Sequence, residues 1–247
     1  MRKVASATPL MSINAVALNT ETTGLDVEIA RVIRIGAVRI RHGRLQQVEC
    51  FDTLVNPGLA IPSASSDVHK IQDDDVRDAP DFNFAAARMA EFCGPSVLIG
   101  HNIGFDLAVL RREYLRNGME WQQTRTLDTL LLTRIVAPVL PDFSLDTIAS
   151  WLGISITGRH TALGDALATG QIFIRLIPAL REQGVNTLAE AEAAMRSFAD
   201  AVSRQAEIGW VPPAPSEVEP SAEKRAVARL IAFSTATKWA TSCANHR

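Results

Sequence analysis

The sequence predicts an α/β fold in which helices cover a mixed β-sheet. Two changes in the apolar pattern along the chain carry this prediction. Residues 13–57 hold three short segments rich in Val and Ile and separated by turn residues, which is typical of an antiparallel meander. After residue 80, helical spacing of apolar residues alternates with a short apolar run at 96–102, which indicates helices and strands in alternation.

The three strands of the expected meander are residues 13–18, 31–40 and 47–57. The segment "RHGR" between the second and third strands supplies the turn residues of a hairpin. Gly36 stands in the middle of the second strand, where a glycine weakens the strand unless another backbone must approach closely. We therefore expect a close backbone approach at Gly36.

The middle of the chain predicts a helix, a buried strand and a second helix, at residues 82–93, 96–102 and 103–117. Gly94 and Gly118 follow the two helices and are typical C-terminal stops. Asn102 precedes the second helix and is a residue type that caps helix starts.

Three more helices are expected beyond residue 125, at residues 126–136, 144–152 and 162–182. Ser144 is a plausible N-cap and Gly153 a stop, while Pro178 is expected to bend or end the long helix. An Ala-rich helix at 187–205 can pack back on the domain, and "VPPAPSEVEPS" after it reads as an extended linker.

Composition restricts the function. A formal charge of -2 does not suggest a protein that coats nucleic acid or an anionic membrane through overall charge. The cysteines Cys50, Cys93 and Cys243 lack CxxC spacing, so neither a disulfide framework nor a zinc knuckle is indicated. Arg175 and Pro178 interrupt the most apolar segment. We expect a soluble, cytoplasmic protein with no membrane contact.

Three short motifs could carry chemistry. In "ALNTETTGLD", Asn19 and Glu21 project from the same face at the end of the first strand, because side chains alternate along a strand. In "IGHNIGFD", Asp106 falls on the first turn of a helix, where the helix dipole favours a carboxylate. Each motif by itself is more often an ordinary solvated loop or a favourable helix start.

The third motif, "GRHTALGDALATG", holds His160 and Asp165. On one regular helix the two side chains would face apart, whereas with His160 in a loop and Asp165 in the first helical turns both can enter one cleft. All three motifs stand where strands or loops lead into helices, which is where an α/β sheet gathers a site. Their joint occurrence is therefore more informative than any one motif.

In this order and spacing the motifs resemble those of the DEDD exonucleases of the ribonuclease H-like superfamily. The resemblance is to the branch with a catalytic histidine (DEDDh), which includes the proofreading epsilon subunit of bacterial DNA polymerase III. It implies a five-stranded mixed sheet flanked by helices and removal of nucleotides from a 3′ end. It covers residues 11–183, which leaves 184–211 as an added C-terminal helix and 212–247 as a Pro-rich linker and tail.

The resemblance also assigns roles. The family's Asp-x-Glu motif falls on Asn19 and Glu21, and its other acidic positions fall on Asp106 and Asp165. These four residues would hold two Mg²⁺ or Mn²⁺ ions, for which oxygen ligands are suited. His160 would be the general base. The implied substrate contacts are Thr22, Thr23, Gly24, Leu25 and Asn102. Asp128 matches a common family position and is interpreted as support for the core.

Asn19 departs from the pattern, because the family has an aspartate that bridges both ions at this position. An uncharged amide should weaken the second ion and slow turnover by about two to four orders of magnitude. A natural pseudo-enzyme, a natural enzyme of low activity and a deliberate substitution all remain open. A second departure is Arg34, where many relatives carry Glu or Gln.

The leading hypothesis is a 3′→5′ exonuclease acting on single-stranded or frayed DNA, with RNA, including very short RNAs, as a possible substrate. The alternative is an inactive module that binds nucleic acid or serves as a scaffold. In either case the C-terminal segment, residues 212–247, can engage a protein partner.

Overall fold

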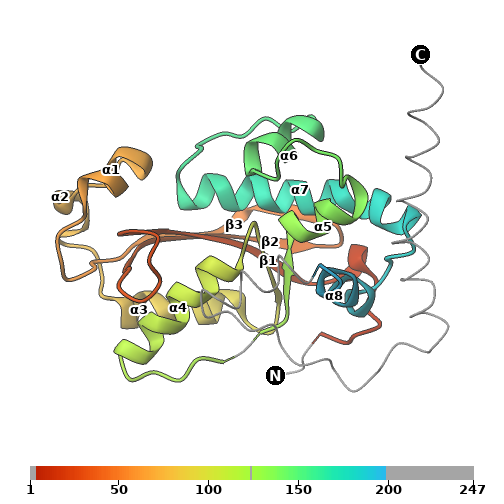
Figure 1. Ribbon diagram of the computed structural model, residues 1–247. Helices are drawn as coiled ribbons and strands as arrows, with labels where there is room; N and C mark the ends of the chain where they lie inside the picture. Colours follow the sequence, from red (N-terminus) through yellow and green to blue (C-terminus); the bar gives the residue numbers. More distant parts are fainter. Residues whose placement is uncertain (1–3, 123, 199–247) are drawn as a thin grey trace, which may run out of the picture. The chain divides into compact units, whose positions relative to one another are not determined.

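A computed structural model describes residues 4–122 and 124–198. These residues form a five-stranded sheet of order β3-β2-β1-β4-β5 with helices on both faces (Figure 1). The strands are β1 (Ala15–Thr22), β2 (Val32–Arg41), β3 (Arg44–Leu54), β4 (Val97–Gly100) and β5 (Thr126–Asp128). β1 pairs antiparallel with β2 and parallel with β4, β2 pairs antiparallel with β3, and β4 pairs parallel with β5. The predicted mixed sheet and its opening meander are confirmed.

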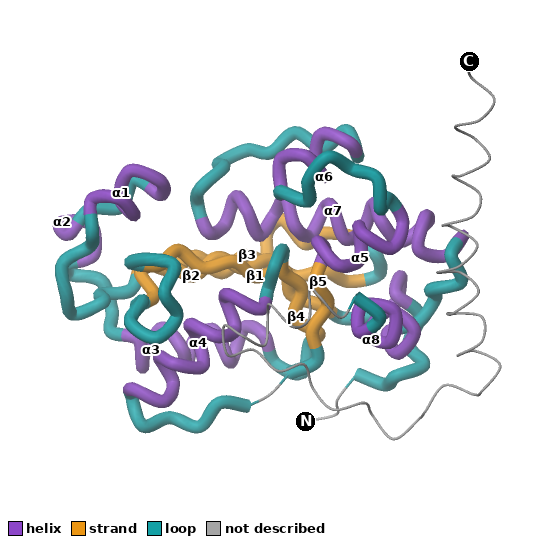
Figure 2. The backbone as a smooth tube through the Cα atoms, viewed as in Figure 1, coloured by secondary structure: helices purple, strands orange, loops and turns teal. Residues whose placement is uncertain are grey.

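One 3-10 helix and eight α-helices accompany the sheet in the described part of the chain. They are η1 (Leu10–Ser12), α1 (Ser63–His69), α2 (Asp73–Val76), α3 (Phe82–Cys93), α4 (Gly104–Arg116), α5 (Thr129–Val136), α6 (Leu145–Trp151), α7 (Ala162–Glu182) and α8 (Leu188–Arg196). α3 and α4 cover one face of the sheet, and α7 covers the other (Figures 1 and 2).

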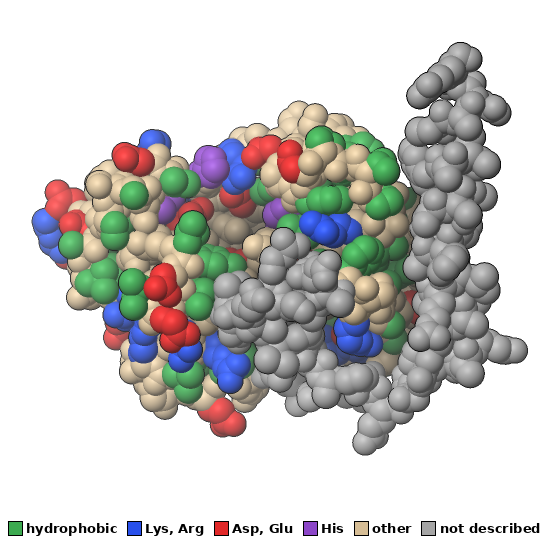
Figure 3. Space-filling model, in the orientation of Figure 1, with side chains coloured by type: hydrophobic (Ala, Val, Ile, Leu, Met, Phe, Trp, Pro, Cys, Tyr) green, Lys and Arg blue, Asp and Glu red, His purple; other side chains and the backbone are tan. Residues whose placement is uncertain are grey.

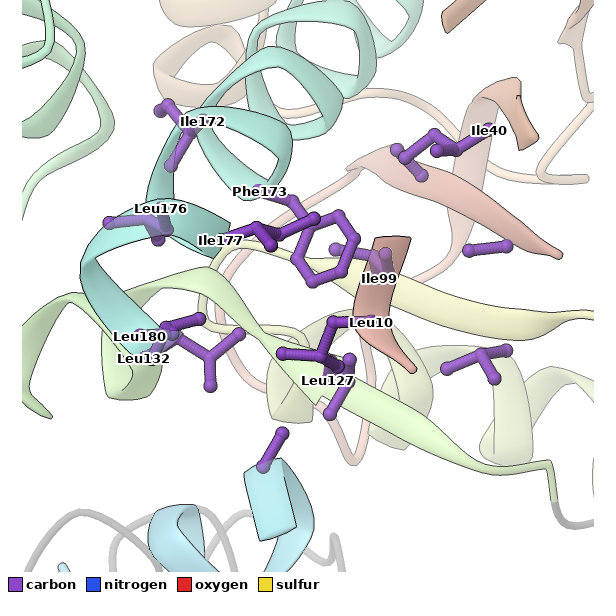
Figure 4. Packing of buried hydrophobic residues seen from close by; sticks show 14 of the residues in the cluster. Leu10, Ile40, Ile99, Leu127, Leu132, Ile172, Phe173, Leu176, Ile177 and Leu180 are labelled. Atoms are coloured by element: carbon purple, nitrogen blue, oxygen red, sulfur yellow. The ribbon is translucent and has the colours of Figure 1, made fainter. Parts of the chain in front are cut away.

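Side chains alternate along β1, so the strand contributes residues to the core on both faces of the sheet. Ala15 and Ala17 pack with apolar residues of α5, α6 and α7, whereas Val16 and Leu18 pack with α3 and α4. Figure 4 shows the first of these clusters, in which side chains of α7 and α5 lie against the strands. Continuing the alternation places Asn19 and Glu21 on the α7 face of the sheet.

α7 crosses the sheet at very short range. A Cβ atom added to Gly36 of β2 would lie 2.2 Å from the backbone of Ala162 and of Leu163, at the start of α7. The close approach expected at Gly36 is therefore confirmed. α7 runs through Pro178 to Glu182. It is long and apolar enough to cross a membrane by composition, with a mean hydropathy of 1.2, but 61% of that window is buried as in a core helix.

Several predicted helix ends are confirmed. α3 ends at Cys93 and is followed by Gly94, and Gly118 follows α4 with a positive φ. The side chain of Ser144 accepts a hydrogen bond from the amide of Thr147 at the start of α6, and Gly153 follows that helix with a positive φ.

Two expectations were wrong in detail. Residues 126–128 form β5 instead of the first turn of a helix, because they pair in parallel with β4 and are buried there. Asn102 does not cap α4 with its side chain; it adopts a positive φ, and Ile103 occupies the N-cap position. The α1 and α2 region, which the sequence pattern did not reveal, packs through its own small apolar cluster around Ile33 and Ile71.

The helix expected at 187–205 begins as predicted. Thr187 and Glu190 form a capping box at the start of α8, and the helix ends at Arg196. Arg125 fastens α8 to the sheet by donating from Nε and Nη2 to the two carboxylate oxygens of Glu192 at 2.8 and 2.7 Å. The expected linker and tail, residues 212–247, lie outside the described residues.

Candidate active site

The end of β1 contributes the first two candidate residues. Asn19 and Glu21 are half-buried although their neighbours along the strand are buried. Asn19 pairs in the sheet with Gly36, the residue over which α7 begins, and the regular pairing with β2 shifts after Glu21. The local geometry therefore aims both side chains at the space beside the first turn of α7.

α4 contributes Asp106, which is buried in its first turn. The pairing of β1 with β4 ends at Ala17 and Ile99, so the amide of Thr20 lies beyond the last strand pair. Asp106 takes the place of a strand partner here, because its Oδ1 accepts hydrogen bonds from the Thr20 amide at 2.8 Å and from the Thr20 hydroxyl at 2.7 Å. The carboxylate is thus held beside the strand that carries Asn19 and Glu21.

α7 contributes Asp165. Thr161 caps the helix by accepting a hydrogen bond from the Gly164 amide at 3.1 Å, which places Asp165 in the first turn. Asp165 Oδ2 accepts a hydrogen bond from Arg159 Nη1 at 2.5 Å. Its other oxygen, Oδ1, is buried and has no hydrogen-bond partner.

His160 lies in the loop directly before the cap of α7. It is exposed and has a φ of 60°, a left-handed conformation that turns the chain sharply into the helix. Its Nδ1 is 3.3 Å from Arg159 Nη1. Of the two arrangements open from the sequence, the structure has His160 in a loop and Asp165 in the first helical turn. In Figure 3, histidine, basic and acidic side chains gather around a hollow between the α1 and α6 regions.

Glu21 lies within the electrostatic influence of the other two carboxylates. Burial and the negative charges of Asp165 and Asp106 together raise the pKa of Glu21 to about 7, while Arg159 and Arg34 lower it. Burial likewise raises the pKa of Asp106 to about 7 against the lowering effect of the Thr20 hydrogen bonds. The pKa of Asp165 is raised by burial and lowered by Arg159. All three acidic groups are thus poorly solvated, and the charges of two of them act on the third.

The donor chemistry suits a hard divalent cation. Three carboxylates and the amide oxygen of Asn19 are oxygen ligands, and Asp165 Oδ1 is a buried acceptor with no partner. However, no group of three or more His, Cys, Asp or Glu side chains within the described ranges is spaced to hold an ion. In this arrangement Asp165 is paired with Arg159, Asp106 is bonded to Thr20, and residue 19 lacks a carboxylate.

The loop after β1 holds the other expected contacts. The Thr22 hydroxyl donates to the Gly24 carbonyl at 2.7 Å, and the Thr23 hydroxyl oxygen accepts from the Arg31 amide at 2.9 Å. These two threonines are buried and fix the turn, whereas Leu25 beside them is 85% exposed. Leu25 is therefore the accessible apolar side chain at the edge of the site.

Asn102 and Asp128 are linked. Asp128 is buried at the start of α5, where its Oδ1 accepts hydrogen bonds from the amides of Leu130 at 2.9 Å and of Asn102 at 3.0 Å. Both amides donate to the same carboxylate oxygen, so Asp128 joins the start of α5 to the segment that leads into α4. This agrees with its interpretation as core support.

Sequence reasoning missed four residues around the site. They are Thr20, Asp52, Asp146 and Arg159. Arg34 donates to both oxygens of Asp52 at 2.8 and 2.6 Å on the neighbouring strand, which accounts for the arginine that stood out in the sequence. Asp146 and Arg159 form an ion pair beside Asp165. The position of Arg159 directly before His160 was a signal, but arginine is not a metal-ligand type.

Comparison with known proteins gives the family. The exonuclease family model matches residues 16–173. The chain is 44% identical over 183 residues to the DNA polymerase III subunit epsilon-like protein of Rhodobacter capsulatus, a match that covers 73% of this chain and 26% of that protein. It is 33% identical over 180 residues to the PolC-type DNA polymerase III of Caldanaerobacter subterraneus subsp. tengcongensis, covering 73% of this chain and 13% of that protein. The chain thus spans about a quarter or less of these relatives.

Solved structures give the same fold. E. coli exonuclease I in complex with a dT13 oligonucleotide superposes with a TM-score of 0.61 at 19% identity, covering 69% of this chain and 42% of that chain. Exonuclease X in complex with 5′ overhanging duplex DNA gives a TM-score of 0.57 at 21% identity, covering 73% and 99%. At these identities the likeness concerns the fold.

The five-stranded mixed sheet of this order, flanked by helices, has the ribonuclease H-like fold of exonuclease I. The chain belongs to the exonuclease family, and within it the chain is similar to DNA polymerase III epsilon-like proteins.

Proposed function

We propose that this chain is a metal-dependent 3′→5′ exonuclease of the DEDDh type whose turnover is reduced by Asn19. The observation that carries the proposal is the placement of Glu21 at the end of β1 near Asp106 of α4 and Asp165 of α7, whose negative charges both raise the pKa of Glu21. Such crowding is costly without a cation and favourable with one.

Different residues of the chain have different roles in the proposed reaction. Glu21, Asp106, Asp165 and the amide of Asn19 would hold two Mg²⁺ or Mn²⁺ ions, which would supply charge stabilisation for the phosphate and the leaving oxygen. His160, exposed in the loop before α7, accepts the proton of the attacking water. Leu25 offers an apolar surface to the terminal base, and the turn held by Thr22 and Thr23 positions it. Asn102, which is exposed in the segment that leads into α4, is a further candidate contact for the substrate.

The substrate is the 3′ end of single-stranded or frayed DNA, with RNA as a second possibility. The net charge of -2 favours a grip on a few nucleotides over binding along a duplex. The exonuclease I and exonuclease X structures with DNA support this choice by fold.

The test compares the chain with Asn19→Asp on a 3′-labelled oligonucleotide in Mn²⁺. Restoring the carboxylate should raise the degradation rate by about two to four orders of magnitude, because the bridging charge for the second ion returns. Asp165→Asn in the Asn19→Asp background is the matched control and should abolish the gain. Products that shorten from the 5′ end would contradict the proposed polarity.

A specific observation favours a second candidate, an inactive nucleic-acid-binding or scaffold module. Among the described residues no ready group of metal-binding side chains is present, and a guanidinium already neutralises Asp165. If the Asn19→Asp chain remains folded and inert but retains affinity for a single-stranded oligonucleotide, this candidate replaces the enzyme.

A further inference from the structure

Arg159 occupies an unusual place between two acidic residues. Its Nε is 3.0 Å from each carboxylate oxygen of Asp146, at the start of α6. Its Nη1 donates to Asp165 Oδ2 at 2.5 Å, in the first turn of α7. One guanidinium therefore bridges an acidic residue outside the site to one of the expected ion ligands.

The two ion pairs differ in their surroundings. The side chain of Asp165 is 8% exposed, that of Arg159 is 29% exposed and that of Asp146 is 59% exposed. Solvent screens the pair with Asp146 more than the pair with Asp165. A guanidinium keeps its charge at every working pH, so Arg159 is a permanent cation against Asp165.

A divalent ion that binds Asp165 meets this cation. The ion and the guanidinium would both bind the same carboxylate, and their positive charges repel each other. Asp165 Oδ1 is buried without a partner and remains available to an ion, while Oδ2 is already used. Asp146 already pairs with Nε of the guanidinium, so Arg159 can leave Asp165 and still keep one acidic partner.

We propose that Arg159 is an internal cation that competes with a divalent ion for Asp165, and that Asp146 accepts it when the ion binds. In this role Arg159 is a positioning residue that sets how tightly the site holds its ion. The inference rests on the proposed metal-dependent function, and it concerns ion affinity and not turnover.

The test is calorimetric titration of the metal-free full chain with Mn²⁺ alone. Arg159→Gln removes the competing charge and should raise the Mn²⁺ affinity about fivefold or more. Arg41→Gln is the matched control: Arg41 pairs with Glu49 and lies five residues from Gly36 along β2, about 17 Å away. This control should leave the Mn²⁺ affinity unchanged.

A second variant moves the affinity in the opposite direction. Asp146→Asn removes the acceptor to which Arg159 retreats and leaves the guanidinium on Asp165, so the Mn²⁺ affinity should fall. In the Arg159→Gln background the same Asp146→Asn change should have no effect, since the competitor is gone. If Arg159→Gln does not fold, as judged by circular dichroism, the Asp146→Asn titration carries the test.

An Arg159→Gln chain that is folded and binds Mn²⁺ no more tightly than the parent overturns the proposal, as does an unchanged affinity in Asp146→Asn. These outcomes are separate from the degradation assay. If Arg159→Gln binds Mn²⁺ more tightly but the Asn19→Asp chain is inert, the competition for Asp165 is supported and the exonuclease function is rejected. If the Asn19→Asp chain is active but Arg159→Gln binds Mn²⁺ no more tightly, the exonuclease function is supported and the competition is rejected.

Discussion

At the scale of single residues, the site is defined by how each carboxylate is held. Asp106 has two hydrogen bonds from Thr20, Asp165 has an ion pair, and the pKa of Glu21 is raised by the charges of both aspartates. An aspartate at position 19 would add a fourth negative charge to the same region. Asn19 therefore lowers the repulsion in the ion-free protein and replaces a charged ligand by an uncharged one in the ion-bound protein.

Thr20→Val tests how Asp106 is held. The substitution keeps the shape of the side chain and removes the hydroxyl that donates to the buried carboxylate at 2.7 Å. We expect the free energy of unfolding at pH 8 to fall by about 1 to 3 kcal/mol. At pH 5 the loss should be smaller, because Asp106, with a pKa of about 7, is then protonated. Urea unfolding at both pH values measures this, and equal losses would show that the carboxylate is not involved.

At the scale of elements, the site depends on the distance between α7 and the sheet. Gly36 lets the backbone of α7 lie against β2, and the Thr161 cap then sets the first turn that carries Asp165. Because Gly36 is the strand partner of Asn19, the same contact fixes Asp165 beside the end of β1. A catalytic constellation on rigid elements depends on such backbone contacts.

Gly36→Ala should separate these elements. Its Cβ would lie 2.2 Å from backbone atoms of α7, which cannot rotate away as a side chain can. We expect a loss of about 1 to 3 kcal/mol in the free energy of unfolding and weaker Mn²⁺ binding. Gly24→Ala is the matched control for stability, because no atom lies within 4 Å of its added Cβ. A stability loss in Gly24→Ala as large as in Gly36→Ala would refute the steric cause.

At the scale of the whole molecule, the buried acidic groups link stability to pH and to cations. The pKa of Glu21 rises from 4.5 to about 7 and that of Asp106 from 3.8 to about 7 on folding. The folded state therefore holds these protons more tightly than the unfolded state. Their stabilising effect is complete below pH 4 and is lost as the pH rises to about 7 and above.

In ion-free buffer the melting temperature should consequently fall between pH 5 and pH 8, by about 5 °C or more for a chain of this size. Mn²⁺ should raise the melting temperature at pH 8 more than at pH 5, because ions bind the ionised carboxylates. Glu21→Gln should flatten the pH dependence of the melting temperature. This result would distinguish the effect of Glu21 from that of titrating histidines. Differential scanning calorimetry measures all three, and a melting temperature that rises from pH 5 to pH 8 without ions would contradict the assignment.

The sequence by itself determined the α/β class, the opening meander, the position of α7 and the motif residues Glu21, Asp106 and Asp165, because periodicity, capping residues and motif order are local signals. The close approach at Gly36 was also foreseen from a single glycine in a strand. Only the tertiary structure decided that residues 126–128 form a strand, since three residues gain that state by pairing with β4. Tertiary structure likewise brought Arg159 and Asp146 against Asp165, because ion pairs between α6, a loop and α7 depend on packing that no local pattern records.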